Sequence, residues 1–585
     1  MFPRLDRVSS GGRAYEYLRL IESYRDARGR CRHRVVVNLG RLDLIGDQLE
    51  DLIDRLRRFC PGAFVRPGEV GNDEAVSWGQ ILVIRHLWEE LGLGGVVERL
   101  CQGRHDFDVA EHAFVLVANR LCAPASEHGL ARWLDCTYVC DRQGQRVLPE
   151  WLPADQVTRE QRVKVSPVWL ARWYRTLDAV YAAKSEIEWE LYLALRDLFH
   201  LKVDLVFYDL TTLYFERREP IGQLRRHGSM DKDGKPRNVK VLLGLVVVNG
   251  FPLASHVFAG NRAEKKTVPE IIADLRTRFG VGEVIFVADR GISSEENRQL
   301  LASLESYHYL FAHRGRRDSK GQRWLHSVGD AWRECGAGTR VQEVPSGEDG
   351  LRAFVVESDE RADYETALRG KSQDRAEAHL RAIAQAVAKG RLKKAAKIER
   401  RAAKALAKDN GHRYFSYHVA GDGQFRYWPD ERKMDAETIR EGRYILTTDH
   451  PTLSPEEAVR HYKELGDVEE NFRNLKDLIE GRPVFHKLDR RVCAHLFMAH
   501  LAMLLLCHLR RRLERSDTII SPRDALAAVQ SLGVAVLDLN GQTRILTARP
   551  KGDCRRVLAA LGIDDTQPPA PPSSPAGTNA PKPPM

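Results

Sequence analysis

The chain has 585 residues, more than a single hydrophobic core usually organises, so we expect at least three domains that each bury a core. Its 91 Lys and Arg exceed its 81 Asp and Glu by 10, a modest excess that permits a polyanionic partner without requiring one. The ten cysteines form no CxxC pair, the first ten residues are charged, and the longest apolar run, 496–509, is too short to span a bilayer. These features argue against a disulfide-stapled, exported or membrane-spanning protein and predict a cytoplasmic one with reduced thiols.

The first 200 residues change from strand-like to helical patterns. Residues 15–24 and 31–39 predict two strands and 47–59 predicts a helix, which together indicate a small α+β unit over 1–70. Over 71–200, apolar residues recur at spacings of three and four, so we predict a mainly helical region with helices at 77–91, 109–121 and 167–199. The many Arg residues of this region make it a candidate for DNA binding. The same helical spacing places most of its tryptophans in the core: Trp78, Trp88, Trp133, Trp169, Trp173 and Trp189.

From residue 201 to 314 the pattern becomes one of buried strands. The elements predicted from these letters follow the order β-β-β-α-β-α, with a hairpin of two central strands around Asn249 and Gly250. Asp209 ends the first apolar strand, and Asp289 ends the fourth. In α/β sheets, functional groups are placed where a strand gives way to a loop. Either aspartate alone could equally cap a turn.

The strand pattern breaks over 315–441, which we interpret as an inserted domain. Between residues 371 and 408 this segment carries twelve Lys and Arg and three Asp and Glu, a local charge of +9. The segment is therefore a candidate DNA contact, with Lys393, Lys394 and Lys397 as its proposed phosphate ligands. The alternative is an exposed Ala-rich helix that the basic residues keep in solution.

A strand at 444–449 resumes the sheet and leads into a helix over 454–483. Ser454 and Glu457 form a capping box at its start. With about 100° per residue, Glu469 falls in the stripe that should be buried, whereas Glu470 lies on the solvated side. A carboxylate in such a stripe is costly unless it is paired or binds a cation, so Glu469 is either a salt-bridge partner of a nearby Arg or Lys or a metal ligand. The candidate salt-bridge partners are Arg473 and Lys476.

The end of the chain divides into three parts. Residues 442–512 complete the α/β part of the chain that begins at residue 201, with a helix at 492–512. Residues 513–565 are predicted to be helical, and 566–585 are too rich in proline and too poor in apolar residues to fold.

Three carboxylates, Asp209, Asp289 and Glu469, could converge on one point. Such a group repels strongly unless cations neutralise it. Oxygen ligands suit Mg²⁺ or Mn²⁺, and two such ions about 4 Å apart can activate an attacking oxygen and stabilise a leaving one. Together with the basic segment, this arrangement favours metal-dependent cleavage and transfer of DNA strands.

The motifs around these residues resemble those of the DDE transposases of bacterial insertion sequences, in the clade with the signature Tyr-x2-Arg-x3-Glu-x6-Lys. Tyr462, Glu469 and Lys476 match at that spacing. The first acidic motif of the family is similar to FYDLTTLYFE in this chain, and the second to VADRG. The resemblance covers most of residues 200–510, and the helical residues before 200 look like the family's N-terminal region.

The resemblance implies an α/β fold with an RNase H-like catalytic core, a mixed sheet with flanking helices, interrupted by an insertion and preceded by the helical region. It also implies that Asp209, Asp289 and Glu469 hold Mg²⁺ or Mn²⁺, and that Tyr462 and Lys476 touch DNA near the cleaved phosphate. The expected partners are double-stranded DNA, as terminal inverted repeats and target, and a second copy of the chain in a dimeric synaptic complex. DNA binding would place the protein at the nucleoid.

The sequence departs from the family pattern at two positions. The signature arginine is Leu465, and Lys463 or Arg473 would have to supply the DNA-contacting charge nearby. The aromatic residue often found after the second aspartate is Ile292, which bears on whether a flipped base is stacked there.

The leading hypothesis is a cut-and-paste transposase. One alternative is a host-adapted DDE nuclease that cleaves DNA without integrating it. Another is a DNA-binding protein without catalysis, against which the three intact acidic positions argue.

Overall fold

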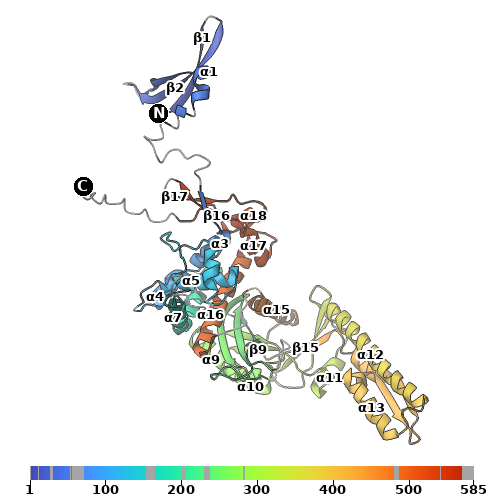
Figure 1. Ribbon diagram of the computed structural model, residues 1–585. Helices are drawn as coiled ribbons and strands as arrows, with labels where there is room; N and C mark the ends of the chain where they lie inside the picture. Colours follow the sequence, from blue (N-terminus) through green and yellow to red (C-terminus); the bar gives the residue numbers. More distant parts are fainter. Residues whose placement is uncertain are drawn as a thin grey trace. The chain divides into compact units, whose positions relative to one another are not determined.

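The structure, a computed structural model (Figure 1), describes residues 2–10, 12–26, 30–49, 51–52, 55, 71–103, 105–152, 165–199, 204–228, 237–280, 283–477, 479, 486–539 and 542–569. Two compact units make up the chain. The first joins Met1–Ser77 to Gly533–Arg549, and the second joins Trp78–Leu532 to Pro550–Met585.

The first unit contains two antiparallel three-stranded sheets. One sheet is formed by β1 (Phe2–Ser10), β2 (Arg13–Arg25) and β3 (Cys31–Arg41), followed by the short helix α1 (Leu42–Ile45). Strands β2 and β3 confirm the two predicted strands, whereas β1 was not expected, because its apolar residues recur every third position and not every second. Most of the helix predicted at 47–59 lies outside the described residues.

The second sheet of this unit corrects the prediction for residues 513–565. Among the described residues of that segment, the helices are the last residues of α16 (Asp489–Arg515), then α17 (Pro522–Val529) and α18 (Gly552–Leu561). Between α17 and α18, β16 (Gly533–Leu539) pairs with β17 (Gln542–Thr547) on one side and with β4 (Gly71–Ser77) on the other. Residues 534–537 form a short continuous apolar run, which is consistent with a strand but does not indicate that its partner β4 lies far away in the sequence.

The second unit begins with the predicted helical region. Its helices are α3 (Gly79–Glu90), α4 (Leu93–Leu100), α5 (Val109–Cys122), α6 (Leu130–Asp135), α7 (Pro167–Ala182) and α8 (Lys184–Phe199). The predicted helix at 167–199 is therefore two helices that meet at Ala183. The core assignment of the tryptophans is confirmed for four of them, which are at most 3% exposed: Trp78, Trp88, Trp169 and Trp173.

The predicted strands belong to a nine-stranded mixed sheet in the order β10-β11-β12-β15-β9-β8-β5-β6-β7. Strands β5 (Leu205–Tyr214), β6 (Lys240–Val248) and β7 (Phe251–Ala259) are antiparallel neighbours. Strands β8 (Val284–Ala288) and β9 (Tyr307–Ala312) continue the sheet parallel to β5. With α9 (Val268–Thr277) before β8 and α10 (Glu295–Ala302) after it, the predicted order β-β-β-α-β-α is confirmed.

The predicted boundary of the inserted domain implies that the sheet is interrupted at residue 315. In the structure, the sheet gains further strands after that residue. After α11 (Ser319–His326), strands β10 (Arg333–Glu334), β11 (Thr339–Val344) and β12 (Arg352–Ser358) extend it, and β12 pairs with β15 (Arg443–Thr448). Their short runs of alternating apolar residues lie between polar loops, which hid them in the sequence.

The segment that leaves the sheet is narrower, from α12 to α14, and it has its own apolar core. Helices α12 (Asp359–Ala388) and α13 (Ala395–Lys408) lie side by side (Figure 1) and pack on the hairpin of β13 (Phe415–Val419) and β14 (Phe425–Pro429). The short helix α14 (Glu431–Thr438) returns the chain to the sheet. The predicted break near Gly390 and the predicted hairpin are both present.

Two long helices follow the sheet. Helix α15 (Pro455–Asp477) begins with the predicted capping box, in which the Glu457 amide donates to Ser454 Oγ (3.2 Å) and the Ser454 amide donates to Glu457 Oε2 (3.1 Å). Helix α16 (Asp489–Arg515) is, among the described residues, the single helix long and apolar enough to cross a membrane. Its apolar stretch is fully buried against the rest of the unit, as in the central helix of a folded core.

Residues 566–569, at the start of the predicted disordered tail, are described. The Trp78 indole Nε1 donates to the Thr566 carbonyl (3.0 Å), which holds this stretch against α3. The remaining residues of the tail lie outside the described part of the chain.

Candidate active site

Asp209 and Asp289 lie on neighbouring strands of the sheet. Strands β5 and β8 are parallel, and the last pair of their register is Tyr208 with Ala288. Each aspartate is the next residue after that pair, so the two backbones are about 4.8 Å apart, the usual spacing of paired strands. The sequence predicts that Asp209 ends its strand, but β5 runs on to Tyr214 along β6. Only the pairing with β8 ends before Asp209. Because that pairing ends there, the sheet is open beside both carboxylates.

Helix α15 packs on β5, β8 and β9 and brings Tyr462 to this opening. The Tyr462 hydroxyl donates to Asp289 Oδ1 at 3.3 Å. Burial, together with the adjacent Asp289 carboxylate, raises the pKa of Tyr462, so its hydroxyl keeps the proton it donates. The hydrogen bond orients the Asp289 carboxylate from the side of α15.

Glu469 lies two turns beyond Tyr462 on α15, roughly 10 Å along the helix axis. It is exposed, although the sequence predicts a place in the buried stripe. Its neighbours one turn away, Leu465 and Phe472, are 5% and 6% exposed, so Glu469 stands at the margin of the packed face. Helical periodicity predicted a buried position for Glu469, but in the structure its side chain is exposed.

The salt bridge that the sequence leaves open for Glu469 is not formed within the described residues, because no ion pair includes it. Arg473 is exposed, and Lys476 is half-buried. The neighbouring Glu470 does have a partner, since Arg510 Nη1 on α16 donates to its Oε2 at 3.0 Å. The two adjacent glutamates therefore differ: Glu470 holds α15 to α16, and Glu469 does not.

The carboxylates fit a hard divalent cation by their chemistry, and two of the three fit it by their position. Asp209 and Asp289 offer oxygen ligands from adjacent strands, as Mg²⁺ or Mn²⁺ requires. Within the described residues, the three predicted carboxylates do not all lie within 4.8 Å of one another. The structure thus assembles the aspartate pair and holds the glutamate on the helix packed beside it.

The loop after Asp289 is held by residues that the sequence did not single out. Arg314 donates from Nε to the Arg290 carbonyl (2.8 Å) and from Nη2 to the Gly291 carbonyl (2.9 Å). The buried Asn297 amide donates to the Ile292 carbonyl (2.8 Å) and to the Lys265 carbonyl (3.0 Å). These contacts link segments too distant in the sequence for any local pattern to reveal.

The packing around this loop bears on two of its residues, Gly291 and Ile292. A Cβ at Gly291 would stand 2.5 Å from Glu264 Oε2, so a side chain at this position requires the Glu264 carboxylate to move. Ile292, which replaces the aromatic residue of the family pattern, is 1% exposed and packs in the core. An isoleucine so buried is not placed to stack on a flipped base.

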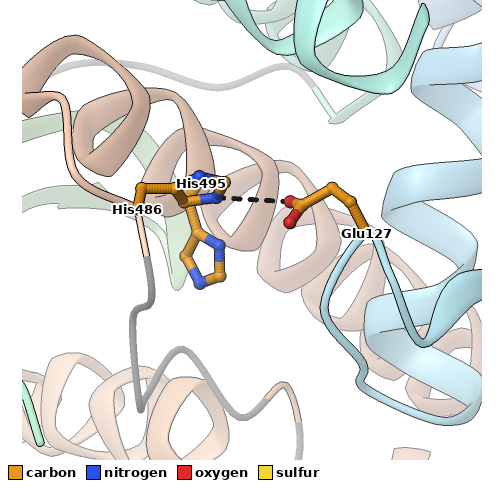
Figure 2. Close-up of side chains that lie close together, drawn as sticks. All are labelled: Glu127, His486 and His495. Atoms are coloured by element: carbon orange, nitrogen blue, oxygen red, sulfur yellow. Dashed lines mark ion pairs between the residues drawn. The ribbon is translucent and has the colours of Figure 1, made fainter. Parts of the chain in front are cut away.

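A second polar cluster, drawn in Figure 2, joins the loop between α5 and α6 to the start of α16. Glu127, His486 and His495 offer ligand atoms within 4.8 Å of one another, and Glu127 Oε1 is 3.3 Å from His486 Nε2. Burial raises the pKa of Glu127, but the hydrogen bond with His486 and the nearby charges outweigh it and lower the pKa to about 2. Residues 127 and 486 are too far apart in the chain for spacing to have indicated this cluster.

The composition of this cluster does not suit a metal ion. Arg120 Nη2 donates to His495 Nδ1 at 3.0 Å, and a guanidinium cannot accept a hydrogen bond. His495 Nδ1 must therefore be the acceptor, which places the ring proton on Nε2, where a metal would need a lone pair. The permanent charge of Arg120 also balances the carboxylate of Glu127. The cluster is an internal ion-pair network that fastens the helical region to α16.

The basic residues of the inserted segment lie on the exposed side of α13 and in the turn that precedes it. The helix packs inward with Ile398, Ala402 and Leu406. Lys393, Lys394 and Lys397 are all exposed, and within the described residues no ion pair includes any Lys or Arg from 389 to 408. On α12, by contrast, Arg381 pairs with Glu377. The α13 face thus carries an uncompensated positive charge.

Comparisons with known proteins agree with the motifs. A family model described as the transposase DDE domain matches residues 205–505, a span that runs from the start of β5 into α16. A second model, the IS1634 family transposase N-terminal domain, matches residues 5–67, which include β2 and β3. No curated protein matches the chain.

Two solved structures with some likeness to the chain are transposase complexes with DNA. One is a piggyBac transposase synaptic complex with hairpin DNA, with 8% identity, coverage of 78% of this chain and 80% of that chain, and a TM-score of 0.34. The other is a Mos1 transposase paired-end complex with left transposon end, with 13% identity, coverage of 35% and 58%, and a TM-score of 0.13. The family model alone covers residues 205–505 of 585, more than half of the chain, and it contains all three acidic positions. The chain therefore belongs to the DDE-type transposases of insertion sequences.

Proposed function

We propose that this protein binds the terminal inverted repeats of its insertion sequence and cuts and rejoins DNA strands with Mg²⁺ or Mn²⁺ held by Asp209, Asp289 and Glu469. The observation that carries the proposal is the side-by-side placement of Asp209 and Asp289, where β8 ends, inside the segment that the DDE domain model matches. Double-stranded DNA is the partner in this proposal, as element ends and as target, and two copies of the chain meet in the synaptic complex.

The catalytic core is, in this proposal, RNase H-like. The sheet order β7-β6-β5-β8-β9, with an antiparallel hairpin on one side of β5 and parallel strands on the other, supports it. So does the position of the acids, since one lies within the central strand and the other at the end of its parallel neighbour. The helix that carries Glu469 packs on those same strands after the inserted segment.

Asp209, Asp289 and Glu469 would hold divalent cations, which when bound would act as Lewis acids and lower the cost of the negative charge that develops on the attacking and leaving oxygens. The chain's own residues prepare that site. Asp209 lies in β5, which pairs with β6, and Asp289 directly follows β8, so the backbones that carry the two carboxylates are in place when the reaction begins. Tyr462 holds the Asp289 carboxylate in one orientation, and Arg314 and Asn297 hold the loop that follows it. Glu469 is exposed beside them, where a duplex can reach it.

The experiment that tests the function uses a supercoiled plasmid in which a marker gene lies between the two sequences that flank the coding region. With the purified full chain and Mg²⁺, we expect double-strand breaks at both flanks, a released linear fragment and its insertion into a second plasmid. Gel analysis and sequencing of the joints measure all three products. Breaks without insertion would instead support a DNA nuclease, and binding without breaks would support a DNA-binding protein that lacks catalysis.

The exposed α13 face gives the DNA a second contact in this proposal. Neutralising Lys393, Lys394 and Lys397 together is expected to weaken binding to any DNA sequence, because phosphates carry no base information. Each lost phosphate contact reduces the slope of log affinity against log salt by about 0.9, so three contacts reduce it by roughly 2.7. Titrations of labelled duplexes at several salt concentrations measure the slope.

Arg381→Ala serves as the control for the triple variant. It removes one positive charge from the same segment, but that charge is already paired with Glu377 at 2.8 Å. We expect Arg381→Ala to leave the slope unchanged. A folded triple variant with both the affinity and the slope of the unmodified protein would show that α13 is a solvated face and makes no DNA contact.

A further inference from the structure

Arg314 lies at the same edge of the sheet as the two aspartates. Strand β9 is parallel to β8, with Ala288 paired to Phe311, so the loop that follows β9 emerges beside Asp289. Arg314 is the second residue of that loop, after His313. Along this edge the strands therefore present Asp209, then Asp289, then a guanidinium.

The guanidinium is fixed in place and still exposed. Its Nε and Nη2 donate to the carbonyls of Arg290 and Gly291, the two residues directly after Asp289. Two hydrogen bonds use part of the five N–H groups that an arginine carries, and the remaining N–H groups belong to an exposed side chain. A long side chain held at two points loses little further freedom when it binds a ligand.

The charge of Arg314 is not neutralised, in contrast to its neighbours. Arg316 forms a bidentate pair with Glu365 (2.9 and 3.0 Å), and Arg317 pairs with Glu437. Within the described residues, Arg314 has no carboxylate partner, and both of its hydrogen bonds go to neutral carbonyls. Of the three arginines in the loop between β9 and α11, Arg314 alone has a charge that no carboxylate of the described residues balances.

We propose that Arg314 binds a non-bridging oxygen of a DNA phosphate at or next to the bond that is cut, an assignment that rests on the proposed function. A phosphodiester is the anion that such a site would meet in a transposase, and guanidinium matches it with parallel N–H donors. The two carbonyl contacts hold the Arg314 guanidinium against the loop that follows Asp289. A phosphate bound to this guanidinium therefore keeps a fixed position relative to the aspartate pair.

The test combines Arg314 variants with DNA that lacks one phosphate charge at a time. The substrate is a duplex of the mapped element end in which single phosphates around the cut are replaced by methylphosphonates. Arg314→Gln removes the charge and keeps an amide that can donate to a carbonyl. Arg314→Lys keeps the charge and loses the planar fork. Arg317→Ala, which breaks an exposed pair with Glu437, is the matched control.

For the natural duplex, we expect Arg314→Gln to cleave about 100-fold more slowly in single-turnover experiments, as when one charge-stabilising donor is removed from an active site. Arg314→Lys is expected to lie between it and the unmodified protein, and Arg317→Ala is expected to match the unmodified protein. At one phosphate, the methylphosphonate should slow the unmodified protein but cause no further loss in Arg314→Gln, the non-additivity of two groups in contact.

Equal slowing of both proteins by every methylphosphonate, or an unmodified rate in Arg314→Gln, would overturn the proposal. Circular dichroism and thermal melting of each variant exclude an unfolded protein as the cause of a loss. If the unmodified protein fails to cut the natural duplex in Mg²⁺, it is the proposed function that fails, and this result is seen before any variant is compared.

Discussion

Replacing Asp289 by alanine is expected to lower strand cleavage by on the order of a thousandfold or more, while binding to the element ends stays within about twofold of the unmodified protein. Asp289 offers its carboxylate where β8 ends, beside Asp209, and Tyr462 fixes its orientation. Loss of one ligand disables a site whose cations must be held together, whereas DNA affinity depends on phosphate contacts made elsewhere. Single-turnover cleavage of an end duplex and a binding titration in Ca²⁺ measure the two quantities separately.

The same loss is expected for Asp209→Ala and for Glu469→Ala, and Glu470→Ala is the matched control for the glutamate. The two glutamates are adjacent on α15, but Glu470 is occupied by Arg510 and Glu469 has no ion pair within the described residues. Removal of a half-exposed pair such as Glu470 with Arg510 costs about 1 kcal/mol of stability at most and leaves cleavage intact. Near-normal cleavage in Glu469→Ala with a severe loss in Glu470→Ala would show that the glutamate is wrongly assigned.

The sequence predicted the two aspartates because buried parallel strands appear as continuous apolar runs, and each run here contains or precedes an acid. It did not predict that β5 continues past Asp209, because that depends on β6 pairing further along β5 than β8 does. Strand pairing is set between segments that are distant in the chain, so a local pattern can place an acid on a strand but cannot say which strand stops beside it.

Glu469 illustrates a second limit. Helical periodicity placed it within about 40° of Leu465, which is buried. Whether Glu469 itself is buried depends on what packs over that side of α15, and in the structure it is exposed. Periodicity gives an angle around the helix axis, whereas burial is a property of the partner surface.

The residues that the sequence did not reveal share one property. Arg314, Asn297 and the pair of Arg120 with His495 act through backbone carbonyls or through partners far away in the chain. No residue type at a fixed spacing marks such contacts. β16 and β17 were missed for a related reason, since their sheet is completed by β4 from near the other end of the chain.

Metal exchange is expected to separate DNA binding from chemistry. In excess chelator the protein should bind DNA without cutting it, Mg²⁺ or Mn²⁺ should restore cutting, and Ca²⁺ should restore none while still occupying the site. The reason lies in coordination: Mg²⁺ demands a near-octahedral set of oxygens at about 2.0–2.1 Å, whereas Ca²⁺ accepts more ligands at about 2.3–2.6 Å in looser geometry. The Asp209 and Asp289 carboxylates, which lie on neighbouring strands, can hold either kind of ion. Only the smaller ions, Mg²⁺ and Mn²⁺, are expected to align the attacking oxygen.

Thermal melting without DNA gives a second measurement of the same prediction. A cation that binds only the folded protein raises its melting temperature by mass action, and it also relieves the repulsion between two adjacent carboxylates. We therefore expect Mn²⁺ and Ca²⁺ each to raise the melting temperature of the unmodified protein, and neither to do so in Asp289→Ala. Cleavage at the unmodified rate in excess chelator would rule out the metal mechanism. A melting shift that persists in Asp289→Ala would place the bound cation at a different site, away from the aspartate pair.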